Sequence, residues 1–170
     1  GYCPYPVTQG SRWRTRSIAR VVAEFQALRD RYGLRFVLLR DPEFSLERKR
    51  TVALCEALIE AGTPILWGCE TRLDTLDDEL IGLMAKAGCM RVAFGIESVR
   101  RAVLTRQGRR ALAPASIRRR VATLKRRGML TYGMYIVGLP GETEESTRAM
   151  IDFSLELDTD AASFSLATPF

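Results

Sequence analysis

The chain has 170 residues, of which 46% are apolar, and a formal net charge of +6 at pH 7. This length and composition suit one globular domain with a buried core. Histidine is absent, which excludes Ser-His-Asp and Cys-His catalysis and imidazole metal ligands within the chain. Cysteines stand at positions 3, 55, 69 and 89, and no two have the Cys-x-x-Cys spacing of a zinc site or redox pair.

The basic excess comes almost entirely from arginine, since only Lys49, Lys86 and Lys125 are lysine among 26 basic residues. An arginine excess suits phosphate or nucleic-acid contact, but solvated helix faces are the favoured interpretation. The densest basic group, at positions 118–120 and 125–127, would wrap around a helix and not line one stripe. No apolar run approaches the roughly 18 residues of a membrane span, so we expect a cytoplasmic protein without a transmembrane segment.

Helical and strand patterns alternate along the chain. Apolar residues follow helical spacing at positions 21–28, 52–59 and 80–87, and each segment precedes a strand-like run. Ser45, Thr75 and Thr143 are candidate helix N-caps, and glycines at positions 33, 62, 88 and 128 are candidate helix ends. The strands are expected at residues 34–39, 65–71, 91–97, 131–138 and 162–168.

Strict alternation with short connections predicts an α/β fold with a parallel sheet. A doubly wound sheet and a barrel share this alternation, and side-chain parity favours the barrel. One face of the second run carries Leu66, Gly68, Glu70 and Arg72, and one face of the third carries Ala93, Gly95 and Glu97. Small residues followed by charged ones suit a barrel interior with room for a ligand near the carboxyl ends of the strands.

The first residues, Gly1-Tyr2-Cys3-Pro4-Tyr5-Pro6, resemble the end of the signature Cys-x-x-x-Cys-x-aromatic-Cys of the radical S-adenosylmethionine (SAM) superfamily. In that resemblance Cys3 is the third thiolate of a [4Fe-4S] cluster, and cysteines are expected immediately before Gly1 and four residues further back. The segment at positions 10–17, with its Arg-x-Arg-Ser sequence, is similar to the cobalamin-binding branch of the superfamily.

Further motifs of the superfamily follow in the same order. Asp41 and Glu43 match the acids that contact the SAM amino group, and Glu70 and Arg72 end the family's third strand, where an arginine can meet the methionine carboxylate. Glu97 and Ser98 match the fourth-strand site for the ribose hydroxyls. Ile136 and Gly138 match the fifth-strand adenine motif Gly-x-Ile-x-Gly-x-x-Gly-Glu, with Met134 at its first glycine.

Each group also has a structural interpretation. Residues 138–143 can be a strand-to-helix turn capped by Thr143, and Arg72 and Glu97 can form a buried ion pair without a ligand. Cys55, Cys69 and Cys89 lie in apolar contexts typical of packing residues.

The resemblance implies a partial TIM-like (β/α)6 barrel without its first strand, spanning residues 1–170 from the third cluster cysteine through the sixth strand. It implies a [4Fe-4S] cluster and SAM as cofactors, with cobalamin on a further domain in the methyltransferase branch. It also implies a small-molecule or lipid substrate and an electron donor such as flavodoxin or ferredoxin. The enzyme would generate a 5'-deoxyadenosyl radical, and the fragment by itself would be inactive.

Three other functions stay open at this point. One is a methylthiotransferase that acts on tRNA or ribosomal protein, for which the positive charge is suited. Another is a basic nucleic-acid-binding module without catalysis, which is not favoured. The last is an ordinary barrel enzyme that binds a phosphate at the loop of residues 138–143.

Overall fold

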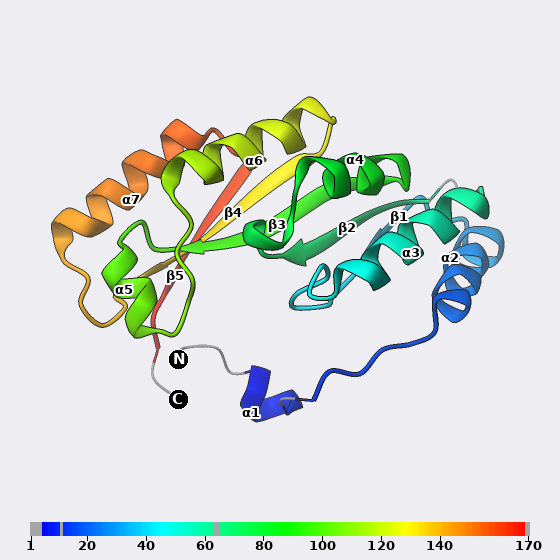
Figure 1. Ribbon diagram of the computed structural model, residues 1–170, viewed down its shortest axis with the longest axis horizontal. Coiled ribbons are helices and arrows are strands. Elements are labelled where there is room, and N and C mark those ends of the chain that lie inside the picture. The colour runs from blue at the N-terminus through cyan, green and yellow to red at the C-terminus, as the bar shows by residue number, and fades with distance from the viewer. Residues whose placement is uncertain (1–4, 11, 63–64, 169–170) are drawn as a thin grey trace.

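A five-stranded parallel sheet forms the centre of the protein, and its strands lie side by side in chain order. The structure is a computed structural model that describes residues 5–10, 12–62 and 65–168. Figure 1 shows the strands curling into part of a barrel. The strands are β1 Phe36–Leu38, β2 Leu66–Thr71, β3 Cys89–Glu97, β4 Leu130–Val137 and β5 Ala161–Leu166.

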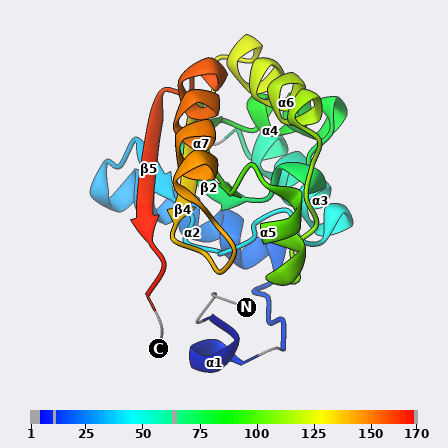
Figure 2. The same ribbon diagram turned by 90° about the vertical axis from the view of Figure 1, so that its left-hand side faces the viewer.

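Helices cover the convex face of this sheet; in Figure 1 α4, α6 and α7 lie on its upper side and α2 and α3 toward its right-hand end. Helix α1 lies apart from them, and α1 and α5 lie at the edge toward which β5 runs (Figure 2). One turn of helix is too short to produce an apolar period, which is why α1 was not expected. The helices are α1 Tyr5–Gln9, α2 Ile18–Tyr32, α3 Arg48–Glu60, the 3-10 turn η1 Leu73–Thr75, α4 Asp78–Lys86, α5 Arg101–Arg106, α6 Pro114–Arg126 and α7 Glu144–Leu157.

The hydrophobic core lies between the sheet and these helices. Alternate strand residues such as Trp67, Cys69, Val92 and Phe94 are fully buried in it. The Trp67 indole N–H is also satisfied, because it donates to the carbonyl oxygen of Ala87 at 2.7 Å. Side chains of opposite parity, such as Glu70, therefore face the inside of the half-barrel.

These observations confirm the predicted α/β class and the partial barrel with parallel strands. All five expected strands are present, with bounds shifted by a few residues. Thr143 is the N-cap of α7, as predicted: its hydroxyl accepts from Ser146 N, and the Ser146 hydroxyl accepts from Thr143 N.

Ser45 and Thr75 are not helix N-caps, so those two predictions were wrong. The Glu47 carboxylate caps α3 and the Asp77 carboxylate caps α4. Ser45 instead hydrogen-bonds through its backbone N–H and its hydroxyl to the Thr71 hydroxyl, and its hydroxyl lies 2.5 Å from that of Thr75. These three hydroxyls join the loop after β1 to the carboxyl end of β2, and a single sequence gives no sign of that contact.

Within the described residues, no helix is both long and apolar enough to cross a membrane. The cytoplasmic location stays a prediction.

A pair of hydrogen bonds joins the start of β4 to the turn before β5. Thr131 N and the Thr131 hydroxyl both donate to one Asp160 oxygen at 2.7 Å. These bonds, the backbone one first, hold the pKa of Asp160 below its usual value. A carboxylate of lowered pKa stabilises the fold above its unfolded pKa of about 3.9, and that stabilisation is lost as pH falls through the folded-state pKa.

We therefore expect Asp160→Asn to lower the free energy of unfolding at pH 7 by up to about 1 kcal/mol, since the carboxylate is largely exposed. The difference from the parent chain should shrink toward zero in acid. Urea unfolding at several pH values measures this, with Asp152→Asn on the exposed face of α7 as the control. An equal loss at every pH would contradict the explanation.

Candidate functional site

The candidate site lies along one edge of the sheet. Because the strands are parallel, their carboxyl ends meet there, and the residues predicted to bind a cofactor lie at or just after those ends. Cys3, the predicted cluster ligand, lies outside the described residues.

Acidic and basic side chains alternate at the ends of β1 and β2. Asp41 is exposed and makes no hydrogen bond or ion pair with another described residue. The Glu43 carboxylate lies 3.7 Å from Arg72 Nε, and Glu70 accepts from Arg40 at 2.6 Å. This part of the edge therefore contains one carboxylate without a described counter-ion and two that face guanidinium groups.

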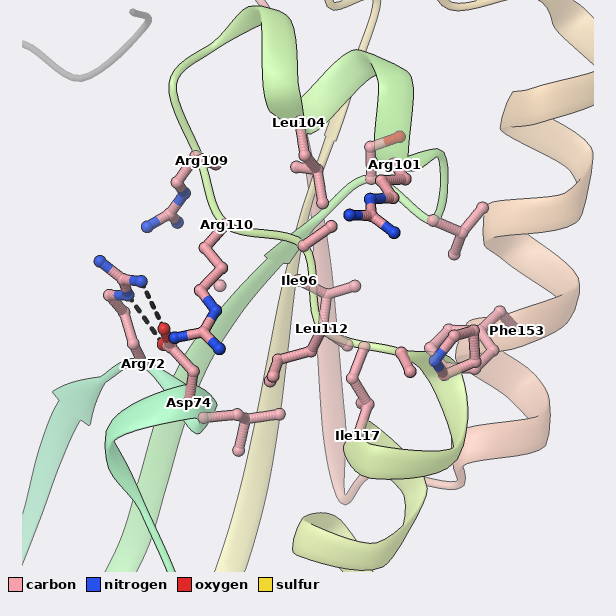
Figure 3. Close-up of a pocket in the computed structure, with 17 residues that line it drawn as sticks. Arg72, Asp74, Ile96, Arg101, Leu104, Arg109, Arg110, Leu112, Ile117 and Phe153 are labelled. Carbon is pink, nitrogen blue, oxygen red and sulfur yellow. Dashed lines mark hydrogen bonds and ion pairs between the residues drawn. The ribbon is translucent and has the colours of Figure 1, made fainter.

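Arg72, the first residue after β2, is held in a fixed orientation. Its Nε and Nη2 donate to the two oxygens of Asp74 at 2.9 and 2.5 Å, a bidentate pair that Figure 3 shows as dashed lines. The backbone carbonyl of Arg72 also accepts from the Thr75 hydroxyl at 2.8 Å. Asp74 therefore fixes the plane of the guanidinium at the mouth of the half-barrel.

Glu97, the last residue of β3, has the most unusual conformation at this edge. Its backbone φ is +65°, in the left-handed region that side chains other than glycine rarely adopt, although the residue is only 9% exposed. The pairing of β3 with β4 shifts register between Gly95 and Glu97. The Glu97 carboxylate turns back over Gly95 to accept from Arg109, and a Cβ at position 95 would collide with it.

Strain of this kind persists only where the surrounding structure imposes it, and such residues concentrate at functional sites. The neighbouring Ser98 is buried, and its hydroxyl accepts from Arg100 N at 3.2 Å. Together with Arg72 and Gly95, it lines a cavity of about 310 Å³ beside the edge.

The loop after β4 exposes backbone at the same edge. Ile136 is half-buried and pairs with Ser165 of β5, and Gly138 has a φ of +84° with open space where a Cβ would stand. Glu142 closes the turn, since its Oε2 accepts from Gly138 N at 2.9 Å and from Leu139 N at 3.2 Å. The turn is thus fixed by Glu142, while its glycine leaves the backbone accessible.

The ion pair between Arg72 and Glu97, which was the alternative structural interpretation of these two residues, is not formed. Arg72 pairs with Asp74 and Glu43, whereas Glu97 pairs with Arg109. The spacing Arg-x-Asp at positions 72–74 could have indicated the contact between Arg72 and Asp74. No sequence signal indicated Arg109, because it lies in an irregular loop twelve residues after Glu97.

The other cysteines are buried on the helix-facing side of the sheet, as expected for packing residues. Burial raises the pKa of Cys55 to about 12. A hydrogen bond from the Cys69 thiol to Cys89, and then burial, raise the pKa of Cys69. Cys55 and Cys69 therefore stay protonated. Among the described residues no cluster of three or more Cys, Asp or Glu could hold a metal ion.

The fold and the edge define a class of protein: an α/β half-barrel with charged side chains at the carboxyl ends of its strands. A family model described as the radical SAM superfamily matches residues 1–154. The chain therefore belongs to the radical SAM superfamily, which confirms the resemblance read from its motifs.

Individual relatives agree with this assignment. The chain is 33% identical over 169 residues to an uncharacterized methyltransferase of Pyrococcus horikoshii, covering 99% of this chain and 37% of the relative. It is 29% identical to the anaerobic magnesium-protoporphyrin IX monomethyl ester cyclase of Rubrivivax gelatinosus, covering 99% and 32%.

A solved structure of the radical SAM methyltransferase TsrM from Kitasatospora setae, with cobalamin and a [4Fe-4S] cluster bound, matches with a TM-score of 0.89 and 28% identity. That match covers 97% of this chain and 33% of TsrM. The chain thus spans about a third of the length of these proteins.

The strain at Glu97 can be measured by two substitutions that both remove the carboxylate. Glu97→Gly should be more stable than Glu97→Ala by about 1 kcal/mol, because glycine adopts a φ of +65° without a steric cost. The difference between the two midpoints of chemical denaturation measures this, and each variant serves as the control for the other. An alanine variant at least as stable as the glycine variant would show that the backbone is not strained.

Proposed function

We propose that residues 1–170 form the SAM-binding core of a radical SAM enzyme, with Cys3 as a ligand of its [4Fe-4S] cluster. The observation that supports this most strongly is the conformation of Glu97. The Glu97 side chain is buried and its carboxylate pairs with Arg109, while its backbone has a left-handed φ. The residue stands at the position where the superfamily motif has the acid for the ribose hydroxyls. Strained residues of this kind cluster at ligand and catalytic sites.

The chemistry of the edge fits each part of SAM. Asp41 and Glu43 supply carboxylates for the ammonium group, and Asp41 makes no ion pair or hydrogen bond with another described residue. Arg72, oriented by Asp74, supplies a guanidinium for the methionine carboxylate. Glu70, on the inner face of β2, pairs with Arg40 from the loop after β1.

The remaining contacts concern the nucleoside. Glu97 and Ser98 would accept hydrogen bonds from the ribose hydroxyls. The backbone from Ile136 to Gly138, left accessible by the glycine and fixed by Glu142, would lie against the adenine. Once bound, the cluster would supply the electron that releases a 5'-deoxyadenosyl radical from SAM. The part of this chain is to orient SAM and to exclude water.

We further propose that the whole protein is a cobalamin-dependent methyltransferase. Support comes from the methyltransferases among its relatives, from the cobalamin bound in TsrM, and from the Arg-x-Arg-Ser segment at positions 14–17. Cobalamin would be bound by another domain, the electron donor would be a flavodoxin or ferredoxin, and the substrate a small molecule or lipid. The related cyclase shows that relatives of this chain are not all methyltransferases.

The cluster assignment is tested by comparing two cysteine substitutions in the full-length protein. After anaerobic reconstitution, Cys3→Ala should lose the visible absorbance of the cluster and the cleavage of SAM to 5'-deoxyadenosine. Cys55→Ala should keep both, because Cys55 packs in the core on the other side of the sheet. Cluster absorbance that survives in Cys3→Ala would disprove the assignment.

The SAM contact is tested at Glu97. Glu97→Gln should weaken SAM binding by about tenfold or more, because an amide replaces the charged acceptor of the ribose hydroxyls. Equilibrium dialysis with SAM measures this. Glu156→Gln removes an exposed carboxylate that pairs with Arg118 on the helical surface, and should bind SAM like the parent. Equal SAM affinity in the parent and Glu97→Gln would remove Glu97 from the site.

A further inference from the structure

The cavity of about 310 Å³ beside the candidate site has an apolar floor. Ile96, on the helix-facing side of β3, contributes to it, together with Ile117 from α6 and Phe153 from α7, all of which belong to the hydrophobic core. Leu104 and Leu112 complete this floor, as Figure 3 shows. The apolar floor of the cavity therefore lies on the helix side of the sheet, while Arg72 and Gly95, which have the inner-face parity, also line it; Asp41, Glu70 and Gly138 do not.

Arginines surround this apolar floor. Arg72, Arg101, Arg109 and Arg110 all line the cavity, and Asp74 is the one acidic residue among the lining residues. Arg72 is paired with Asp74, and Arg109 with Glu97. Neither the Arg101 nor the Arg110 guanidinium makes a hydrogen bond or ion pair with a described residue. In Figure 3 Arg110 lies on the side of the Arg72–Asp74 pair and Arg101 on the side of Phe153.

The charge of this wall is thus not compensated by the described residues. Two guanidinium groups are neutralised by carboxylates and two are not. The first turn of α6 forms part of the same wall, and no side chain caps it, so its helix dipole adds to the positive potential. The two unpaired arginines are exposed to solvent and border a concave apolar surface, the combination by which proteins bind amphipathic anions.

We propose that this cavity binds the substrate, and that the substrate joins an apolar body to a carboxylate or phosphate. The apolar body would lie on Ile96, Leu112 and Phe153, and the anionic group would accept hydrogen bonds from Arg101 and Arg110. This inference rests on the proposed function for its place in the reaction, because Gly95 and Ser98 join the cavity to the strand end that carries Glu97. The anion site itself depends only on the cavity and its charges.

Three probes that share a naphthyl group test the ligand class: 2-naphthoate, 2-naphthyl phosphate and the neutral 2-naphthamide. Fluorescence titration of the full-length protein should show that at least one anion binds about tenfold or more tightly than the amide. The tighter of the two anions identifies carboxylate or phosphate as the natural group. If the amide binds as tightly as both anions, or if none of the three binds, the proposal is wrong.

Substitutions then locate the binding. Arg101→Gln and Arg110→Gln should each weaken the preferred anion by about tenfold and leave the amide unchanged. Arg119→Gln, at an exposed arginine of α6 outside the cavity, is the matched control and should bind the anion like the parent. Unchanged anion binding in the Arg101→Gln/Arg110→Gln double variant, with its thermal unfolding midpoint preserved, would overturn the proposal.

SAM binding, measured in the same samples, separates this proposal from the proposed function. The double variant should bind SAM like the parent. If it loses SAM together with the anion, the cavity belongs to the SAM site, and the substrate assignment fails while the proposed function stands. If the parent binds the anion but no SAM, the proposed function fails while the anion site stands.

Discussion

The common direction of the five strands is the constraint on which the site depends. A parallel sheet brings every strand end to one edge, so residues separated by about a hundred positions, such as Asp41 and Gly138, meet there without any local motif that joins them. The helices that connect the strands lie on the outer face of the sheet, so the loops after the strands form this edge. The buried face of each strand supplies the packing energy, and the opposite face is free to carry charged groups such as Glu70.

Arginine supplies the positive charges at this site, where many other sites use histidine or lysine. Arg40, Arg72 and Arg109 each hold a carboxylate of the edge, and the planar guanidinium fixes the orientation of its partner as well as its charge. Other arginines pair with acids on the helical surface, as Arg118 does with Glu156. The arginine excess of the sequence is therefore explained in part by ion pairs within this fold, without a nucleic-acid partner.

Features repeated along the chain could be predicted, and features made by one unusual contact could not. Alternation of helical and strand periods predicted the α/β class and all five strands, and parity correctly placed Glu70 and Gly95 inside the half-barrel. The left-handed backbone of Glu97 leaves no trace in the sequence, because glutamate rarely adopts it and only the fold imposes it. The hydroxyl contacts of Ser45 with Thr71 and Thr75 span 26 and 30 residues, so the local sequence around Ser45 and Thr75 could not distinguish these two residues from helix caps.

One irregular loop connects the two halves of the site. Arg109 holds the Glu97 carboxylate, and the adjacent Arg110 lines the apolar cavity. The loop is short and leads directly into α6 at Pro114, whose fixed φ limits how the chain can enter the helix. Arg110 is joined to Arg109 by one peptide unit, so the proposed anion site and the proposed nucleotide contact are neighbours along the chain as well as at the sheet edge.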